Sequence, residues 1–94
     1  MPHTKSAKKR LRQSIKRHLY NKSIKSAIKT QRKKFLAAVS AGDLEAARTE
    51  FRRTVKVYKQ AAAKGVIHDN VAARVESRLA RKLNALIAAQ SAAG

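Results

Sequence analysis

The feature that most constrains the fold is an unbroken helical pattern over residues 4–41. This stretch has no Gly, Pro, Asp or Glu, and it holds 13 of the 23 Lys and Arg of the chain. Because Lys, Arg, Leu, Ile and Ala favour the α-helix, the pattern predicts one continuous helix over about residues 6–41. At 1.5 Å per residue this helix is roughly 50 Å long, longer than a small domain is wide. It must therefore project beyond whatever the remaining residues form.

The charges of this helix repel one another. Lys8, Arg12 and Lys16 follow each other at i,i+4, and no carboxylate lies between them to offset the repulsion. The pattern therefore predicts that residues 4 to about 20 are frayed in the free protein and fully ordered against a polyanion. Thr4 or Ser6 is predicted to cap the helix, after a disordered start that ends at Pro2.

The apolar residues of the first helix change face partway along it. In the carboxyl-terminal half they share an arc of roughly 120°, which is the ordinary width of a core-facing stripe. The residues of this arc are Tyr20, Ile24, Ala27, Ile28, Phe35, Ala38 and Val39. Leu11, Ile15 and Leu19, spaced by four, point largely away from it. The carboxyl-terminal half is therefore predicted to belong to a bundle, and the amino-terminal half to extend from it.

Two further amphipathic helices are predicted, over about residues 44–64 and 70–89. Gly42 suits the left-handed position after the first helix and Asp43 the N-cap of the second, while Gly65 suits the end of the second. Asp69 or Asn70 is predicted to cap the third. The expected core positions are Leu44, Ala47, Phe51, Val55, Tyr58 and Ala62 in the second helix and Ala72, Val75, Leu79, Leu83 and Leu86 in the third. The tail AAQSAAG is expected to fray.

Three amphipathic helices joined by tight turns predict an all-α fold. Its architecture is an up-down-up three-helix bundle with a long overhanging N-terminal helix, in which residues 1–94 form a single domain. No strand pattern, internal repeat or linker is visible in the sequence.

The composition argues against several classes of function. There is no cysteine, and His3, His18 and His68 have no Cys or carboxylate partner at metal-ligand spacing. His68 is interpreted as a partly buried turn residue hydrogen-bonded to backbone. No phosphate-binding loop or nucleophile motif occurs, so we expect no enzyme, no metal and no cofactor. No stretch reaches the ~20 apolar residues of a membrane span, and the amino terminus lacks the apolar region of a secretory signal.

The formal net charge of +18 favours phosphates or anionic headgroups as partners. Four aromatic residues are too few for a platform that stacks unpaired bases. In the first helix the basic residues point around nearly the whole circumference, which favours contact with more than one nucleic-acid segment, and small polar residues among them suit phosphate and 2′-hydroxyl contacts. The candidates for RNA binding in this helix are Lys5, Ser6, Lys8, Lys9, Arg10, Arg12, Ser14, Lys16, Arg17, Asn21, Lys22, Ser23, Lys25, Ser26, Lys29 and Thr30.

The third helix carries a second basic group. Its members are Arg74, Ser77, Arg78, Arg81 and Lys82. An ordinary solvated face explains this group better than it explains the first helix, because Glu76 is expected to dilute the patch. Lys33, Lys34, Lys56 and Lys59 also suit a solvated face.

Four blocks of the chain resemble the bacterial small-subunit ribosomal protein family conventionally numbered twenty. They are KSAKKR (5–10), NKSIKSAIKT (21–30), AGDLEAA (41–47) and KGVIHDN followed by AARVESRLARKLNAL (64–86). The resemblance implies a cytoplasmic protein of the small ribosomal subunit that binds 16S ribosomal RNA and supports subunit assembly. It also implies neighbouring small-subunit proteins as further partners, with no homo-oligomer and no membrane. Val75, Glu76 and Asp69 depart from the family, in which these positions are typically basic.

Two other functions compete with this one. A nucleoid-associated DNA-binding protein is the alternative, although the dimer interface or apolar wedge typical of DNA-bending folds is not visible. A membrane-active cationic helix should segregate its polar and apolar faces, whereas bases surround the first half of this helix.

Overall fold

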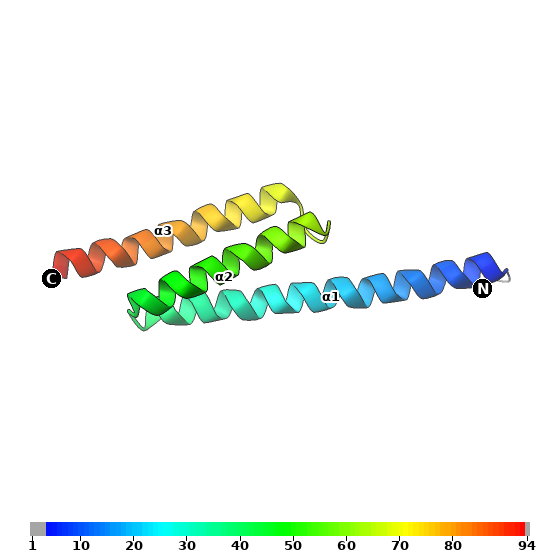
Figure 1. The fold of residues 1–94 in the computed structure, drawn as a ribbon, viewed down its shortest axis with the longest axis horizontal. Helices are drawn as coiled ribbons and strands as arrows, with labels where there is room; N and C mark the ends of the chain where they lie inside the picture. Colours follow the sequence, from blue (N-terminus) through cyan, green and yellow to red (C-terminus); the bar gives the residue numbers. More distant parts are fainter. Residues whose placement is uncertain (1–3, 94) are drawn as a thin grey trace.

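The computed structural model describes residues 4–93 and forms three helices over that range (Figure 1). They are α1 (Lys5–Ser40), α2 (Leu44–Ala63) and α3 (Asp69–Ala93), with no strand among the described residues. The chain runs up, down and up, α2 lies between α1 and α3, and the molecule extends 70 × 22 × 16 Å. The predicted all-α three-helix bundle with a long first helix is confirmed. The expectations for Pro2, His3 and Gly94 concern positions outside the described residues.

The first helix is continuous over 36 residues and begins at the predicted cap. The Thr4 side-chain oxygen accepts a hydrogen bond from the Ala7 N–H at 3.1 Å. In Figure 1 the amino-terminal part of α1 extends past the turn between α2 and α3, with no other helix beside it. We call residues 5–19 the overhang; their side chains are exposed except that of Ala7. The overhang is helical from Lys5 onward in the structure, and its fraying in the free protein stays a prediction.

The stability of the overhang is a separate quantity from its conformation, and the sequence makes a prediction about it. Because the overhang lacks both tertiary packing and i,i+4 ion pairs, its local opening should cost little free energy. We expect amide hydrogens from Lys8 to Arg17 to exchange much faster in the free protein than those from Phe35 to Val39. Strong protection of the overhang without RNA would contradict this prediction.

Both turns between helices have the same hydrogen-bond pattern, built around a glycine with positive φ. Gly42 (φ 72°) donates to the Val39 carbonyl at 3.0 Å, and Asp43 donates to the Ala38 carbonyl at 3.2 Å. Gly65 (φ 76°) and Val66 repeat these two bonds at the end of α2. This is the Schellman motif, which requires the left-handed conformation that glycine adopts without strain. The predicted turns are therefore confirmed, as is Asp43, whose carboxylate accepts from the Ala46 N–H at 3.1 Å.

The start of α3 differs from the prediction. Asp69 or Asn70 was expected to cap this helix, but both lie within it. His68 forms the cap instead. Its Nδ1 accepts a hydrogen bond from the Asn70 N–H at 3.0 Å, and its carbonyl accepts one from the Val71 N–H at 3.0 Å. The interpretation of His68 as a turn residue bonded to backbone is confirmed, whereas its expected partial burial is wrong, because the side chain is exposed.

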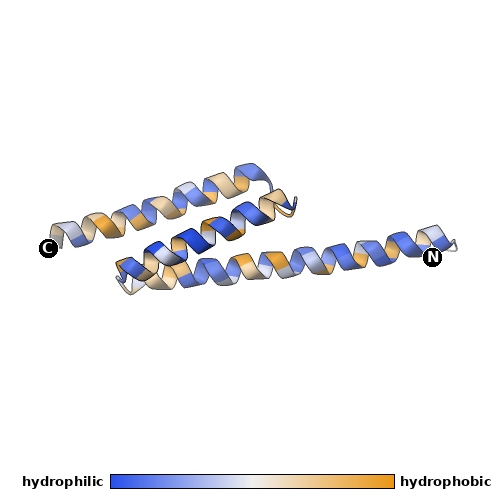
Figure 2. Ribbon diagram, viewed as in Figure 1, coloured by the Kyte–Doolittle hydropathy of each residue, from blue (hydrophilic) through white to orange (hydrophobic). Residues whose placement is uncertain are grey.

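The core consists of two apolar clusters, each containing residues from all three helices. The buried members of one cluster are Ile28, Tyr58, Ala61 and Ala72. The buried members of the other cluster are Phe35, Ala47, Leu79 and Leu83. Val75 packs against both clusters and joins them. In the hydropathy colouring, hydrophobic and hydrophilic positions alternate along all three helices, as expected for amphipathic helices (Figure 2).

Two predicted core residues are exposed, and several others, Phe51 among them, are only half-buried. Tyr20 is 50% exposed and Ala27 is also exposed, while Phe51 is only half-buried. Tyr20 lies where α2 ends, so no helix covers its ring; the Lys64 ammonium lies 5.8 Å from the ring centroid instead. Because Ala27 is exposed, it lies at the edge of the core-facing arc rather than inside it.

A polar seam that the apolar pattern did not predict joins α1 to α2. Thr54 is fully buried, and its hydroxyl donates to the Glu50 carbonyl at 2.7 Å. The Gln31 side-chain amide donates to the Glu50 carboxylate. Every buried side-chain polar atom among the described residues has a hydrogen-bond partner. These hydrogen bonds therefore orient α2 against α1 and leave no buried polar group unsatisfied.

The carboxyl-terminal segment was expected to fray after residue 89, but α3 continues to Ala93. Its residues are mostly Ala, the strongest helix former. The Gln90 side-chain amide donates to the Gly42 carbonyl and thus ties this segment to the first turn.

Candidate nucleic-acid interface

The predicted RNA-binding residues of α1 form a surface of cations and small polar groups. All sixteen have exposed side chains except Asn21, which is half-buried. Two ion pairs occur among the described residues, Arg53–Glu50 at 3.0 Å and Lys59–Glu76 at 4.0 Å, and neither involves α1. The cations of α1 therefore keep their hydrogen-bond donors available for a partner. Figure 2 shows the amino-terminal half of α1 as largely hydrophilic, with isolated hydrophobic positions.

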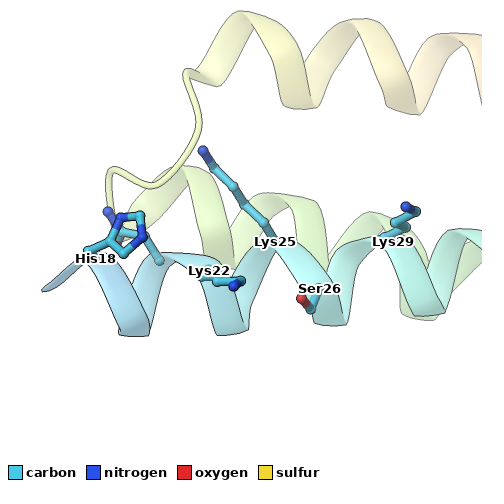
Figure 3. A pocket seen from close by; sticks show the side chains of 6 residues that line it. His18, Lys22, Lys25, Ser26 and Lys29 are labelled. Atoms are coloured by element: carbon cyan, nitrogen blue, oxygen red, sulfur yellow. The ribbon is translucent and has the colours of Figure 1, made fainter. Parts of the chain in front are cut away.

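A shallow groove lies where the overhang meets the bundle. It is lined by His18, Asn21, Lys22, Lys25, Ser26 and Lys29. All six come from α1, and the ammonium groups of Lys22, Lys25 and Lys29 extend in different directions (Figure 3). Three ammonium groups, a hydroxyl and an imidazole within one open groove provide many donors and no carboxylate, which is the chemistry of phosphate recognition.

The basic group of α3 lies on a separate surface. Arg74, Ser77, Arg78, Arg81 and Lys82 are all exposed, and α2 lies between α3 and the bundle half of α1. The structure therefore does not bring the two predicted groups into one site. It leaves a large basic surface on α1 and a smaller one on α3.

Glu76, which was expected to dilute the α3 surface, is paired with a lysine of α2 rather than with a cation of α3. The Glu76 carboxylate approaches the Lys59 ammonium of α2 at 4.0 Å, on the flank of α3 that faces α2. Val75 is also directed inward, where it packs against the core. Val75 and Glu76, two of the three residues that depart from the resembled family, therefore serve the contact between α2 and α3. Neither of the two ion pairs among the described residues involves a cation of α3.

Comparison with known proteins agrees with the resemblance noted in the sequence. Residues 2–84 match the family model described as Ribosomal protein S20. This chain belongs to that family. A match over most of the chain covers the overhang, both turns and the greater part of α3.

Individual relatives in the S20 family cover nearly the same range. "Small ribosomal subunit protein bS20" of Clostridium kluyveri is 53% identical over 88 residues, which is 94% of this chain and all of the relative. The protein of the same name from Clostridium botulinum (strain Eklund 17B) is 51% identical over 92% of this chain and 99% of its own length. The protein of this name from Natranaerobius thermophilus is 49% identical over 89% of this chain and 96% of its own length.

His18 lines the groove but was not among the predicted site residues of this S20 family member. The signal for it was present in the sequence, because His18, Lys22, Lys25 and Lys29 follow the i, i+4, i+7 and i+11 spacing of one helix face. The sequence alone is compatible with His18 as a polar face residue or as an RNA contact, and an imidazole can form hydrogen bonds in either role.

The described range of residues 4–93 contains no group of three His, Cys, Asp or Glu side chains placed to hold a metal ion. None of its helices combines the length and the apolar composition that crossing a membrane requires.

Proposed function

We propose that this chain is a structural constituent of the bacterial small ribosomal subunit, that it binds 16S ribosomal RNA directly through α1, and that it supports assembly of the subunit. The cytoplasmic ribosome is then its location, and neighbouring small-subunit proteins are its further partners. Membership in the S20 family and the names of its relatives support the ribosomal role. The role is structural rather than catalytic.

The observation that carries RNA binding is the charge of α1 together with its exposure. Thirteen Lys and Arg and no acid lie in residues 1–41, and the overhang that bears many of them packs against no other helix. Maintaining so many like charges on one helix is unfavourable in isolation and becomes favourable when phosphates replace the missing carboxylates. The predicted α1 residues act as the main RNA contacts, and those of α3 as a second, smaller contact.

A competition experiment tests this function. The full chain is titrated with a 16S ribosomal RNA transcript, an unrelated RNA of equal length, duplex DNA and anionic vesicles, all at one salt concentration because phosphate binding depends on salt. We expect the 16S transcript to bind most tightly and to survive excess unrelated RNA. Equal competition by duplex DNA would support the nucleoid-associated alternative and contradict the ribosomal one.

A further inference from the structure

Three large apolar side chains form a continuous row on the exposed overhang. Leu11, Ile15 and Leu19 are 51%, 52% and 59% exposed. Their i,i+4 spacing places them along one line about 12 Å long, given the rise of 1.5 Å per residue. We call them the apolar ridge. The ridge points away from the core-facing stripe of α1, and no other helix lies beside this part of it (Figure 1). The fold of this chain therefore does not explain the ridge.

Two polar rows border the ridge. Three residues before each ridge residue is a cation, and these are Lys8, Arg12 and Lys16. Three residues after each ridge residue is a smaller polar or basic group, and these are Ser14, His18 and Lys22. Residues three apart on a helix are surface neighbours, with Cβ atoms about 5–6 Å apart. The overhang, together with Lys22 just beyond it, thus presents three parallel rows, cationic, apolar and polar, across a face roughly 10 Å wide.

This arrangement matches the surface of double-stranded RNA in its shallow groove. An A-form helix has a wide, shallow minor groove that displays ribose and 2′-hydroxyl groups, with phosphates at its edges. Ribose C–H groups suit the apolar ridge, phosphates suit the cationic row, and 2′-hydroxyls suit Ser14 and the imidazole of His18. Charge complementarity identifies the partner as a polyanion, because residues 1–41 contain no acid.

We infer that the apolar ridge docks into the shallow minor groove of a double-stranded RNA segment, with the cationic row on the adjacent phosphates. This inference rests on the proposed function and adds a mode of contact that charge alone does not provide. Leu11, Ile15 and Leu19 bind through apolar burial, which does not depend on counterion release. The ridge therefore distinguishes the shape of an RNA duplex from other arrays of phosphates.

Other occupants fit this face less well. The minor groove of B-form DNA is only about 6 Å wide, too narrow for a face of three rows. A membrane surface prefers a helix whose charges are confined to one side, whereas Arg10 and Arg17 lie on other sides of the overhang. A second copy of this chain would bring two cationic rows together at a cost in repulsion.

The test separates apolar contact from charge by their salt dependence. A Leu11→Gln/Ile15→Gln/Leu19→Gln variant of the full chain retains every charge and keeps good helix formers. Binding to the 16S transcript is measured over a series of KCl concentrations. We expect the affinity to fall about 10- to 100-fold at every concentration, since half of each side chain remains available for burial. The log–log salt slope should stay unchanged, because no phosphate contact is removed.

Two matched controls accompany this variant. Leu11→Met/Ile15→Leu/Leu19→Met keeps the row apolar and should bind like the parent. Val71→Gln removes an apolar side chain that is 41% exposed at the start of α3, outside the ridge, and should also bind like the parent. Circular dichroism should show the same melting temperature for all variants, because these residues lie outside the core clusters.

Footprinting of the RNA by hydroxyl radicals locates the contact. We expect the parent to protect paired riboses on both strands of a duplex segment and the Gln variant to lose that protection. Unchanged affinity of the Gln variant, or changed protection at unpaired nucleotides alone, would overturn the inference while leaving the proposed function intact. If the parent itself failed to prefer the 16S transcript, the proposed function would fail first.

Discussion

Replacing Lys8, Lys9 and Arg10 together by Gln should flatten the salt dependence of RNA binding. Each phosphate contact contributes roughly −0.7 to −0.9 to the slope of log affinity against log salt concentration. Ten basic residues lie from Lys5 to Lys29, and if half to two-thirds of them engage phosphates the parent slope is about −4 to −6. Loss of three contacts should reduce its magnitude by up to about 2 to 3. Binding titrations over a range of KCl concentrations measure this change.

The structure provides a matched control for the charge variant. Arg48, Arg52 and Lys56 are exposed and lie four residues apart on α2, so replacing them by Gln removes the same charge from the bundle. We expect a smaller change in slope from this control, and unchanged melting temperatures for both variants, because neither set contributes to the core clusters. Unchanged affinity and slope in the overhang variant would show that α1 is not the main electrostatic contact.

The Phe35→Ala substitution should be the most destabilising single change in the bundle. Phe35 is fully buried, and it belongs to the cluster that joins α1 to Leu79 and Leu83 of α3. Truncation of a buried Phe costs about 3–5 kcal/mol, because it removes apolar contacts and leaves a cavity. A domain of this size has a free energy of unfolding of only about 5–15 kcal/mol. We therefore expect the melting temperature to fall by tens of degrees, at about 4–8 °C per kcal/mol.

Phe51 provides the comparison for Phe35. The sequence pattern predicted Phe51 as a fully buried core residue, with the same 3–5 kcal/mol cost on truncation. The structure leaves it half-buried, with its ring centroid 5.9 Å from that of Phe35. Phe51→Ala should therefore cost less than Phe35→Ala in the free energy of unfolding, roughly 2–3 kcal/mol, because part of the ring is already in contact with water. Equal melting temperatures for the two variants would contradict this ranking of the two rings.

The sequence predicted the helices and turns well because local chemistry determines them. Gly42 and Gly65 occupy left-handed positions that other residues adopt at a cost, and Asp43 and Thr4 cap the helices that follow them. The cap at His68 was missed, since Asp69 and Asn70 are the stronger capping types and stand next to it.

Burial was predicted less accurately, because a stripe of apolar residues does not reveal where the partner helix ends. Tyr20 continues the α1 stripe in sequence, yet α2 stops beside it at Ala63. Thr54 and Gln31 interrupt the apolar pattern, and their burial depends on hydrogen bonds between helices that no periodicity encodes.

The candidate site could be predicted as far as its charge but not its geometry. Exposure of the α1 cations follows from the length of the helix alone. The direction of Glu76 toward Lys59 depends on how α3 packs on α2, and so the unopposed basic surface of α3 could be recognised only from the fold. The groove at His18 likewise required the positions of side chains.

The central position of α2 has a consequence for how quickly the protein reaches its native state. Most contacts between helices join α1 to α2 or α2 to α3, which are neighbours along the chain, and few join α1 to α3. Helical proteins with such local contacts fold within microseconds to milliseconds, because little loop entropy is lost before each contact forms. Bacterial chains are synthesised at about 5–20 residues per second, which is far slower. The bundle should therefore be complete almost as soon as its last helix is synthesised.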